Sequence, residues 1–176
     1  AGGGMSNTTG GNITITRCTF ADNTASNNGG GMYNNNGSDP VIHDCTFSNN
    51  TADTNGGGMF NSSSSPEMTN CTFSGNSAIN RGGGIFNSGS IPEMTNCTFS
   101  ENTTGADDSG GGIYNHSSNP IATNCIFWGD DPGTTAGQIV GEGGTYTYCV
   151  TDQSGTGNTT EDPKLEALAN NGGPTQ

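Results

Sequence analysis

The stretch from Gly56 to Asn76, GGGMFNSSSSPEMTNCTFSGN, contains every marker that decides the fold. It opens on three glycines followed by Met59, and Cys71 and Phe73 precede its final Asn. The same markers return in the same order on both sides of this stretch. A sequence that repeats with one period of about 20 to 50 residues is typical of solenoids and propellers.

Three markers keep a single register along the chain. The cysteines are separated by 27, 26, 26, 28 and 24 residues: Cys18, Cys45, Cys71, Cys97, Cys125 and Cys149. After each of the first five, Phe follows two residues later and Asn or Asp three further on: Phe20 and Asn23, Phe47 and Asn50, Phe73 and Asn76, Phe99 and Asn102, Phe127 and Asp130. The glycine triplets lead to Met or Ile at Met5, Met32, Met59, Ile85 and Ile113.

The repeat length and composition select one architecture. Glycine triplets, Asn and Thr disfavour helices, and a propeller blade needs about 40 residues. About 26 residues suit one coil of three short strands, stacked about 4.8 Å from the next coil. The sequence therefore predicts an all-β protein, a right-handed parallel β-helix (solenoid) of about five to six coils. We expect regular coils over residues 1–132, and a final coil with a less regular closing segment over residues 133–176.

Side-chain alternation predicts what each coil buries. Met68, Cys71 and Phe73 all point inward if Asn70 marks a bend, because alternation alone cannot bury all three. Asn and Asp tolerate the left-handed backbone of such a bend. We therefore expect ladders of like residues: an inward file of Cys18, Cys45, Cys71, Cys97 and Cys125; an inward file of Phe20, Phe47, Phe73, Phe99 and Phe127; and a ladder of Asn23, Asn50, Asn76 and Asn102. At the bend, the stacked side chains of Asp44, Asn70, Asn96 and Asn124 can hydrogen-bond from coil to coil.

Composition limits the partners. Lys and Arg total 3 against 16 Asp and Glu, which gives a formal net charge of -13. This excess opposes binding to nucleic acid and to anionic lipid. Only 27% of the residues are hydrophobic, which a solenoid tolerates because each coil buries a few side chains between its neighbours. We expect no nucleic-acid partner and no membrane insertion.

The glycine triplet before Met or Ile, together with Phe-x-x-Asn, resembles the repeats of chlamydial polymorphic outer-membrane proteins and of many secreted bacterial right-handed parallel β-helix proteins. The resemblance runs from residue 1 to about residue 131, and the segment 162–175 is similar to the segment that closes such β-helices in large bacterial surface proteins. It implies an extracellular or bacterial cell-surface location and an adhesive or structural role.

The cysteines allow two interpretations. Zinc sites favour Cys pairs about two to four residues apart, and no two cysteines here are closer than 24 residues. Parallel Cβ vectors in stacked coils keep the Cβ atoms about 4.8 Å apart, beyond the roughly 3.8 Å of a disulfide. We expect a buried thiol ladder in which Cys acts as a small apolar side chain; disulfides are the alternative.

Catalysis would need basic or paired acidic residues at suitable positions. A lyase similar to the pectate enzymes needs Asp-bound calcium and an Arg or Lys base, but the cations occupy unlike repeat positions: Arg17, Arg81 and Lys164. The two histidines, His43 and His116, also differ in repeat position.

Paired carboxylates can act as acid and base in glycosidases. The pairs Asp107/Asp108 and Asp130/Asp131 lie in predicted loops, where Asp is a common turn residue. We expect no enzyme, no catalytic residue and no required cofactor.

Two further surface features lead to predictions. Glu67 and Glu93 share one repeat position, so their like charges either are screened by solvent or recruit a cation such as calcium. An outward threonine file is the feature on which ice binding would depend: Thr19, Thr46, Thr72 and Thr98.

The ends of the coil stack suggest the function. The chain begins with the marker Gly2–Met5, so we expect an open first coil that docks on the terminal coil of another copy. The alternative is that the chain is a fragment of a longer β-helix. Head-to-tail contacts between identical subunits generate filaments. We therefore predict a structural subunit of an extracellular fibre or surface stalk. An adhesin-like module that binds a host or glycan surface is the alternative, and a carbohydrate-active lyase or hydrolase is less favoured.

Overall fold

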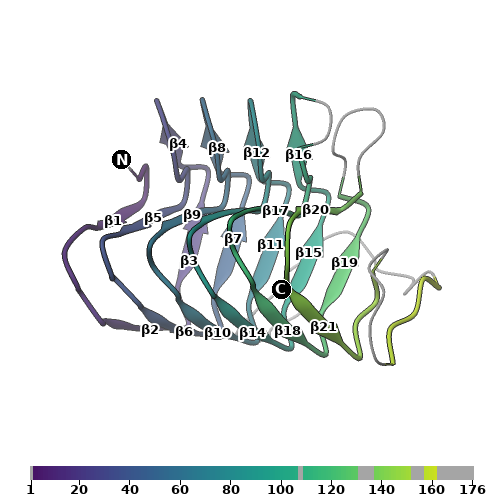
Figure 1. Cartoon of the computed structure of the whole chain (residues 1–176). Helices are drawn as coiled ribbons and strands as arrows, with labels where there is room; N and C mark the ends of the chain where they lie inside the picture. The colour runs from purple at the N-terminus through teal and green to yellow at the C-terminus, as the bar shows by residue number, and fades with distance from the viewer. Residues whose placement is uncertain (1, 107–108, 131–136, 152–156, 162–176) are drawn as a thin grey trace.

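The computed structural model describes residues 2–106, 109–130, 137–151 and 157–161. Over these residues the chain forms 21 short strands and no helix, and all named strand pairs are parallel. The strands stack coil upon coil along one axis (Figure 1). The predicted parallel β-helix is confirmed.

The strands assemble into four parallel sheets, which we call A to D. Sheet A contains β1 (Met5–Asn7), β5 (Met32–Asn35), β9 (Met59–Ser62), β13 (Ile85–Ser88), β17 (Ile113–His116) and β20 (Ile139–Gly141). Sheet B contains β2 (Thr14–Thr16), β6 (Val41–His43), β10 (Glu67–Thr69), β14 (Glu93–Thr95), β18 (Ile121–Thr123) and β21 (Thr145–Thr147). Sheet C contains β3 (Thr19–Ala21), β7 (Thr46–Ser48), β11 (Thr72–Ser74), β15 (Thr98–Ser100) and β19 (Ile126–Trp128). Sheet D contains β4 (Thr24–Ala25), β8 (Thr51–Ala52), β12 (Ser77–Ala78) and β16 (Thr103–Thr104).

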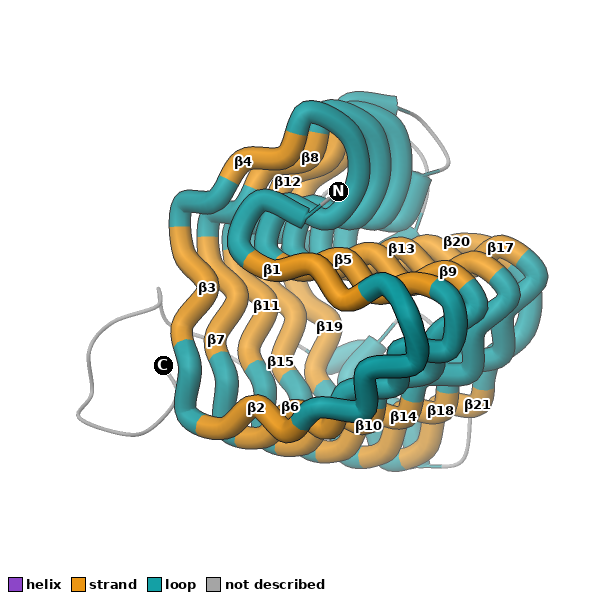
Figure 2. Tube along the Cα trace, turned by 90° about the vertical axis from the view of Figure 1, so that its left-hand side faces the viewer, coloured by secondary structure: helices purple, strands orange, loops and turns teal. Residues whose placement is uncertain are grey.

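Sheet D corrects the expectation of three strands per coil. In four successive coils the chain leaves the solenoid along a two-residue strand and returns through the glycine triplet, forming projections that we call the arms (Figure 2). The arms are thin because the inward residues of sheet D are small: Ala25, Ala52, Ala78 and Thr104, all buried. The segment that forms each arm shows no apolar pattern in the sequence that is long enough to predict a strand.

The glycine triplet forms the neck of each arm. In the second coil, Gly56 has a φ of 67°, a backbone conformation that glycine adopts without penalty. A Cβ on Gly57 would lie 2.4 Å from the Gly83 carbonyl oxygen and 2.5 Å from that of Ser77. A Cβ on Gly58 would lie 2.7 Å from the Gly84 carbonyl oxygen. The triplet therefore permits backbones of adjacent coils to approach where a side chain would separate them.

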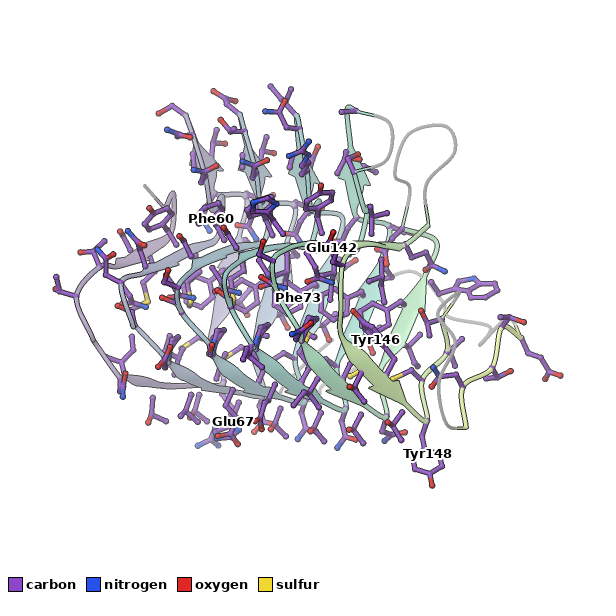
Figure 3. All side chains as sticks on the ribbon, in the orientation of Figure 1. Phe60, Glu67, Phe73, Glu142, Tyr146 and Tyr148 are labelled. Atoms are coloured by element: carbon purple, nitrogen blue, oxygen red, sulfur yellow. The ribbon has the colours of Figure 1, made fainter. Side chains whose placement is uncertain are left out.

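A bend between sheets B and C turns the inward residues as expected. Asn70 has a φ of 55°, and the equivalent residues Arg17, Asp44, Asn96 and Asn124 also have positive φ. Met68, Cys71 and Phe73 are buried around this bend. Figure 3 shows Phe73 inside the solenoid and Glu67 outside it.

The coil stack continues past residue 132. Strands β20 and β21 extend sheets A and B by one coil, and isolated bridges join Ile126 to Val150 and Val150 to Thr159. The boundary proposed at residue 132 stays a prediction, since parts of 133–176, including 162–176, lie outside the described residues.

Candidate functional site

Asparagine ladders run along the solenoid. Asn76 Nδ2 donates to Asn102 Oδ1 (2.8 Å) and to the carbonyl of Phe47 (2.9 Å), and its backbone N–H also donates to Asn102 Oδ1 (3.0 Å). The same ladder links Asn23, Asn50, Asn76 and Asn102 and continues to Asp130. Each amide thereby bonds one backbone N–H and one backbone carbonyl of the preceding coil, as Asn76 does with Asn50 and Phe47. The predicted asparagine ladder is confirmed.

Two further ladders were not predicted as such. Buried amides on the inner face of sheet A connect Asn7, Asn34, Asn61, Asn87 and Asn115. Aromatic rings on its outer face stack in the order Tyr33, Phe60, Phe86, Tyr114, with centroids 5.1, 5.2 and 5.6 Å apart. The aromatic residues and the amides occupy neighbouring positions of the short strand that follows each glycine triplet. Both ladders follow from the in-register stacking of this strand from coil to coil.

The inward phenylalanines stack face to face from Phe20 to Phe127, with centroid distances of 4.6 to 4.8 Å. Phe47, Phe73, Phe99 and Phe127 are fully buried, but Phe20 is only half-buried. Phe20 belongs to the first coil and stacks on one neighbour, Phe47, among the described residues. The inward file is therefore complete only inside the coil stack.

The cysteines are all free thiols. Cys45, Cys71, Cys97, Cys125 and Cys149 are buried, whereas Cys18 is exposed. Burial raises the pKa of Cys45 to about 11, which keeps it a neutral thiol. The expectation of a buried ladder is thus wrong for Cys18, because this residue lies in the first coil.

Thiol labelling should separate the two environments. With iodoacetamide on the dilute native protein at mildly alkaline pH, where the chains are not stacked, we expect alkylation of Cys18 and protection of the five buried thiols, because the thiolate is the nucleophile and needs access. Labelling after denaturation is the control and should modify all six. Mass spectrometry gives the count. Fast native labelling of Cys71 or Cys97, or three disulfides in the folded chain, would contradict the thiol ladder.

The two glutamates lie side by side in strands β10 and β14, with Glu67 paired in register to Glu93. Both are exposed, and their in-register neighbours are Val41 and Ile121. Calcium takes about six to eight oxygen ligands, and the described residues contain no group of three or more His, Cys, Asp or Glu that could hold a metal ion. Calcium binding by this pair stays a prediction. It requires that chelation lower the melting temperature of the wild type but not of Glu67→Gln/Glu93→Gln.

Among the described residues, those considered for catalysis do not converge. Arg17 lies at the bend between sheets B and C, Arg81 lies in an arm, and His43 and His116 lie on sheets B and A. Lys164 and the carboxylates Asp107, Asp108 and Asp131 fall outside the described residues. Asp130 accepts hydrogen bonds from Asn102 and so continues the asparagine ladder.

The threonine file on sheet C is not a continuous surface. Thr46 and Thr72 are buried, whereas Thr19 is exposed. A binding face for ice needs a regular exposed row, so this file does not supply one.

The first coil presents an edge of each sheet. β1 and β2 end the strand order of sheets A and B, and β3 and β4 end that of sheets C and D. In the second coil, three backbone N–H groups donate to carbonyls of the first coil: Val41 to Ile13, Thr46 to Cys18 and Thr51 to Asn23. The equivalent N–H groups of the first coil belong to Thr14, Thr19 and Thr24. Because successive coils repeat this geometry, these three N–H groups point away from the second coil.

The arms form a pocket of about 360 Å³ lined by Asn55, Asn80, Arg81 and Ala106. The guanidinium carbon of Arg81 lies 4.9 Å from the centroid of the Tyr114 ring, at the end of the outer aromatic ladder. An arginine and two amides are groups that bind small polar molecules. Sequence reasoning missed this site because Arg81 and Tyr114 occupy different repeat positions in neighbouring coils.

Comparison with known proteins extends these observations. A family described as a right handed beta helix region matches residues 1–153. This span includes the first-coil edge, the arms and all 21 strands. No match to the chain was found among curated proteins or among solved structures. No helix long and apolar enough to span a membrane occurs in the part of the chain that the structure describes.

Proposed function

Since the chain belongs to the right-handed β-helix family, we propose that it is a non-enzymatic structural subunit of an extracellular fibre or surface stalk. Its coils would stack on a second copy through the first coil. The observation that carries this proposal is that the strands of all four sheets pair in parallel and in register from coil to coil, so that a further coil of the same kind would continue every sheet. An unpaired parallel edge of such a stack templates further strand pairing.

The side chains of the first coil support the same proposal. Phe20 and Met5 are half-buried and Cys18 is exposed, whereas their equivalents Phe47, Met32 and Cys45 are fully buried one coil later. A docked coil would bury this apolar surface and continue the phenylalanine and thiol ladders. Because the two contacting surfaces differ, the contact is heterologous and propagates into a filament unless a ring closes.

A proline in the edge tests the stacking. Thr19→Pro removes an N–H that points away from the second coil, so we expect the variant to fold and to lose self-association. Sedimentation velocity over a concentration series should show growing oligomers for the wild type and a smaller species for the variant. Thr19→Ala is the matched control, since it loses the same side chain but keeps the N–H, and it should assemble. A wild type that stays monomeric at every concentration would reject the proposal.

The surface location rests on the resemblance of the glycine-triplet and Phe-x-x-Asn motifs to secreted β-helix repeats. Antibodies raised against the folded chain should label intact cells of the source organism. Labelling only after the cells are permeabilised would reject this location.

An adhesin-like binding module is the second candidate. The arm pocket supports it, because Asn55, Asn80 and Arg81 offer polar groups to a ligand at an outer rim of the solenoid. The binding function would use the arms, and the structural function would use the first coil. Variants of the first coil therefore test the structural function, and variants of the arms test the binding function.

A further inference from the structure

Arg81 interrupts a regular file of the arms. The residues immediately before the last four of the five glycine triplets, those that close the arms, are Asn28, Asn55, Arg81 and Ser109. Asn55 Nδ2 and its backbone N–H both donate to Asn28 Oδ1, each at 3.2 Å, as in the other amide ladders. Arg81 continues the backbone pairing through a bridge with Asn55 but replaces the amide by a cation. Arg81 thus places a charged side chain at this repeat position, although the stacking of the coils does not require a charge there.

The guanidinium of Arg81 is held in place but remains accessible. Its carbon lies 4.9 Å from the Tyr114 ring centroid, and that ring stacks on Phe86 in the outer aromatic ladder. Contact with an aromatic face favours one position of the cation. Arg81 is nevertheless exposed, and among the described residues no carboxylate forms an ion pair with it. In a chain of net charge -13, an exposed arginine that forms no ion pair within the described residues is available to an external anion.

The neighbouring groups complete a pocket for a polar molecule. Asn80 is exposed, and its backbone N–H donates to the Thr54 carbonyl (2.9 Å), which fixes its position in the arm. Asn55 is held by its bonds to Asn28. Ala106 occupies the repeat position of Asn80 in the next arm and also lines the pocket. Amides that both donate and accept hydrogen bonds are suited to sugar hydroxyls.

We propose that the arm pocket binds a sugar that carries a single carboxylate, such as a terminal uronic acid, with Arg81 on the carboxylate and Asn55 and Asn80 on hydroxyls. The planar guanidinium matches a carboxylate through two parallel hydrogen bonds. A volume of about 360 Å³ lies at the lower end of the range for small-ligand pockets and suits one sugar ring. The negative charge of the chain disfavours polyanions, which limits the ligand to one charge. The inference rests on the binding-module candidate above and names its ligand class.

Titration with glucuronate, followed by amide chemical shifts in two-dimensional NMR, tests the site. We expect saturable shifts at Asn55, Asn80 and Arg81, and no saturable shifts there with glucose at equal concentration. Arg81→Gln should weaken glucuronate binding at least about tenfold. Arg81→Lys should weaken it less, because lysine keeps the positive charge but lacks the paired N–H donors of the guanidinium. Arg17→Gln is the matched control: it removes the other described arginine, lies outside the arms and should bind as the wild type does.

The remaining outcomes are equally decisive. Absence of saturable shifts with glucuronate, equal shifts with glucose, or unchanged affinity in Arg81→Gln would overturn the proposal. Acetate or inorganic phosphate binding as tightly as glucuronate would also overturn it, because the sugar would then contribute nothing. Melting temperature shows whether each variant is folded, and Tyr114→Phe, which keeps the aromatic ring, should retain binding. Sedimentation of Arg81→Gln should equal that of the wild type, so a failure of this proposal is distinguishable from a failure of coil stacking.

Discussion

Phe73→Ala is expected to lower the free energy of unfolding by about 3 to 5 kcal/mol, the usual range for truncating a buried phenylalanine. Phe73 is fully buried, and its ring stacks between Phe47 at 4.6 Å and Phe99 at 4.8 Å. The substitution leaves a cavity in the middle of the ladder, and two rings lose a stacking partner. Equilibrium denaturation with urea measures the change.

The matched control is Phe20→Ala in the first coil. Phe20 is half-buried and stacks on Phe47 alone among the described residues, so its truncation should cost clearly less than that of Phe73. A loss below about 1 kcal/mol for Phe73→Ala, the scale of ordinary surface substitutions, would contradict the inward phenylalanine ladder.

Gly57→Ala is expected to destabilise the protein by about 3 kcal/mol or more, because overpacking against a backbone that cannot move exceeds the usual cost of an added methyl group. The new Cβ would lie 2.4 and 2.5 Å from carbonyl oxygens of Gly83 and Ser77. Both contacts are with backbone of the next coil, so relief requires separation of the two coils. Thermal unfolding followed by circular dichroism gives the effect.

Gly11→Ala is the control for this substitution. A Cβ on Gly11 meets no atom within 4 Å, and its φ is not in the left-handed region. The change should therefore stay within about 0.5 kcal/mol of the wild type. Similar melting temperatures for the two alanine variants would mean that the neck of the arm is wider than the structure shows.

The coil and its register follow from the sequence because like residues stack directly on one another. A spacing of 26 residues between Cys71 and Cys97 places Phe73 over Phe99 and Asn76 over Asn102, so one alignment predicts several ladders. The bend at Asn70 was predictable for a local reason, since three inward side chains require a residue with positive φ.

The arms and the first coil depended on information that a repeat alignment lacks. The fourth strand forms because the glycine triplets bring backbones together, and that approach is a property of three-dimensional packing. Exposure of Cys18 arises from its place in the stack, although its repeat position equals that of buried Cys71. The contact between Arg81 and Tyr114 joins unlike positions of neighbouring coils, and self-comparison of a sequence detects only like positions.

Hydrogen exchange at low and high protein concentration tests coil stacking most directly. The N–H groups of Thr14, Thr19 and Thr24 point away from the second coil, whereas those of Gly4 and Asp22 donate to Gly30 and Ser48 within the stack. We predict that the three threonine amides exchange fast in dilute solution and become protected at high concentration, while the amides of Gly4 and Asp22 stay protected throughout. Fast exchange of Thr14, Thr19 and Thr24 at every concentration would contradict the account.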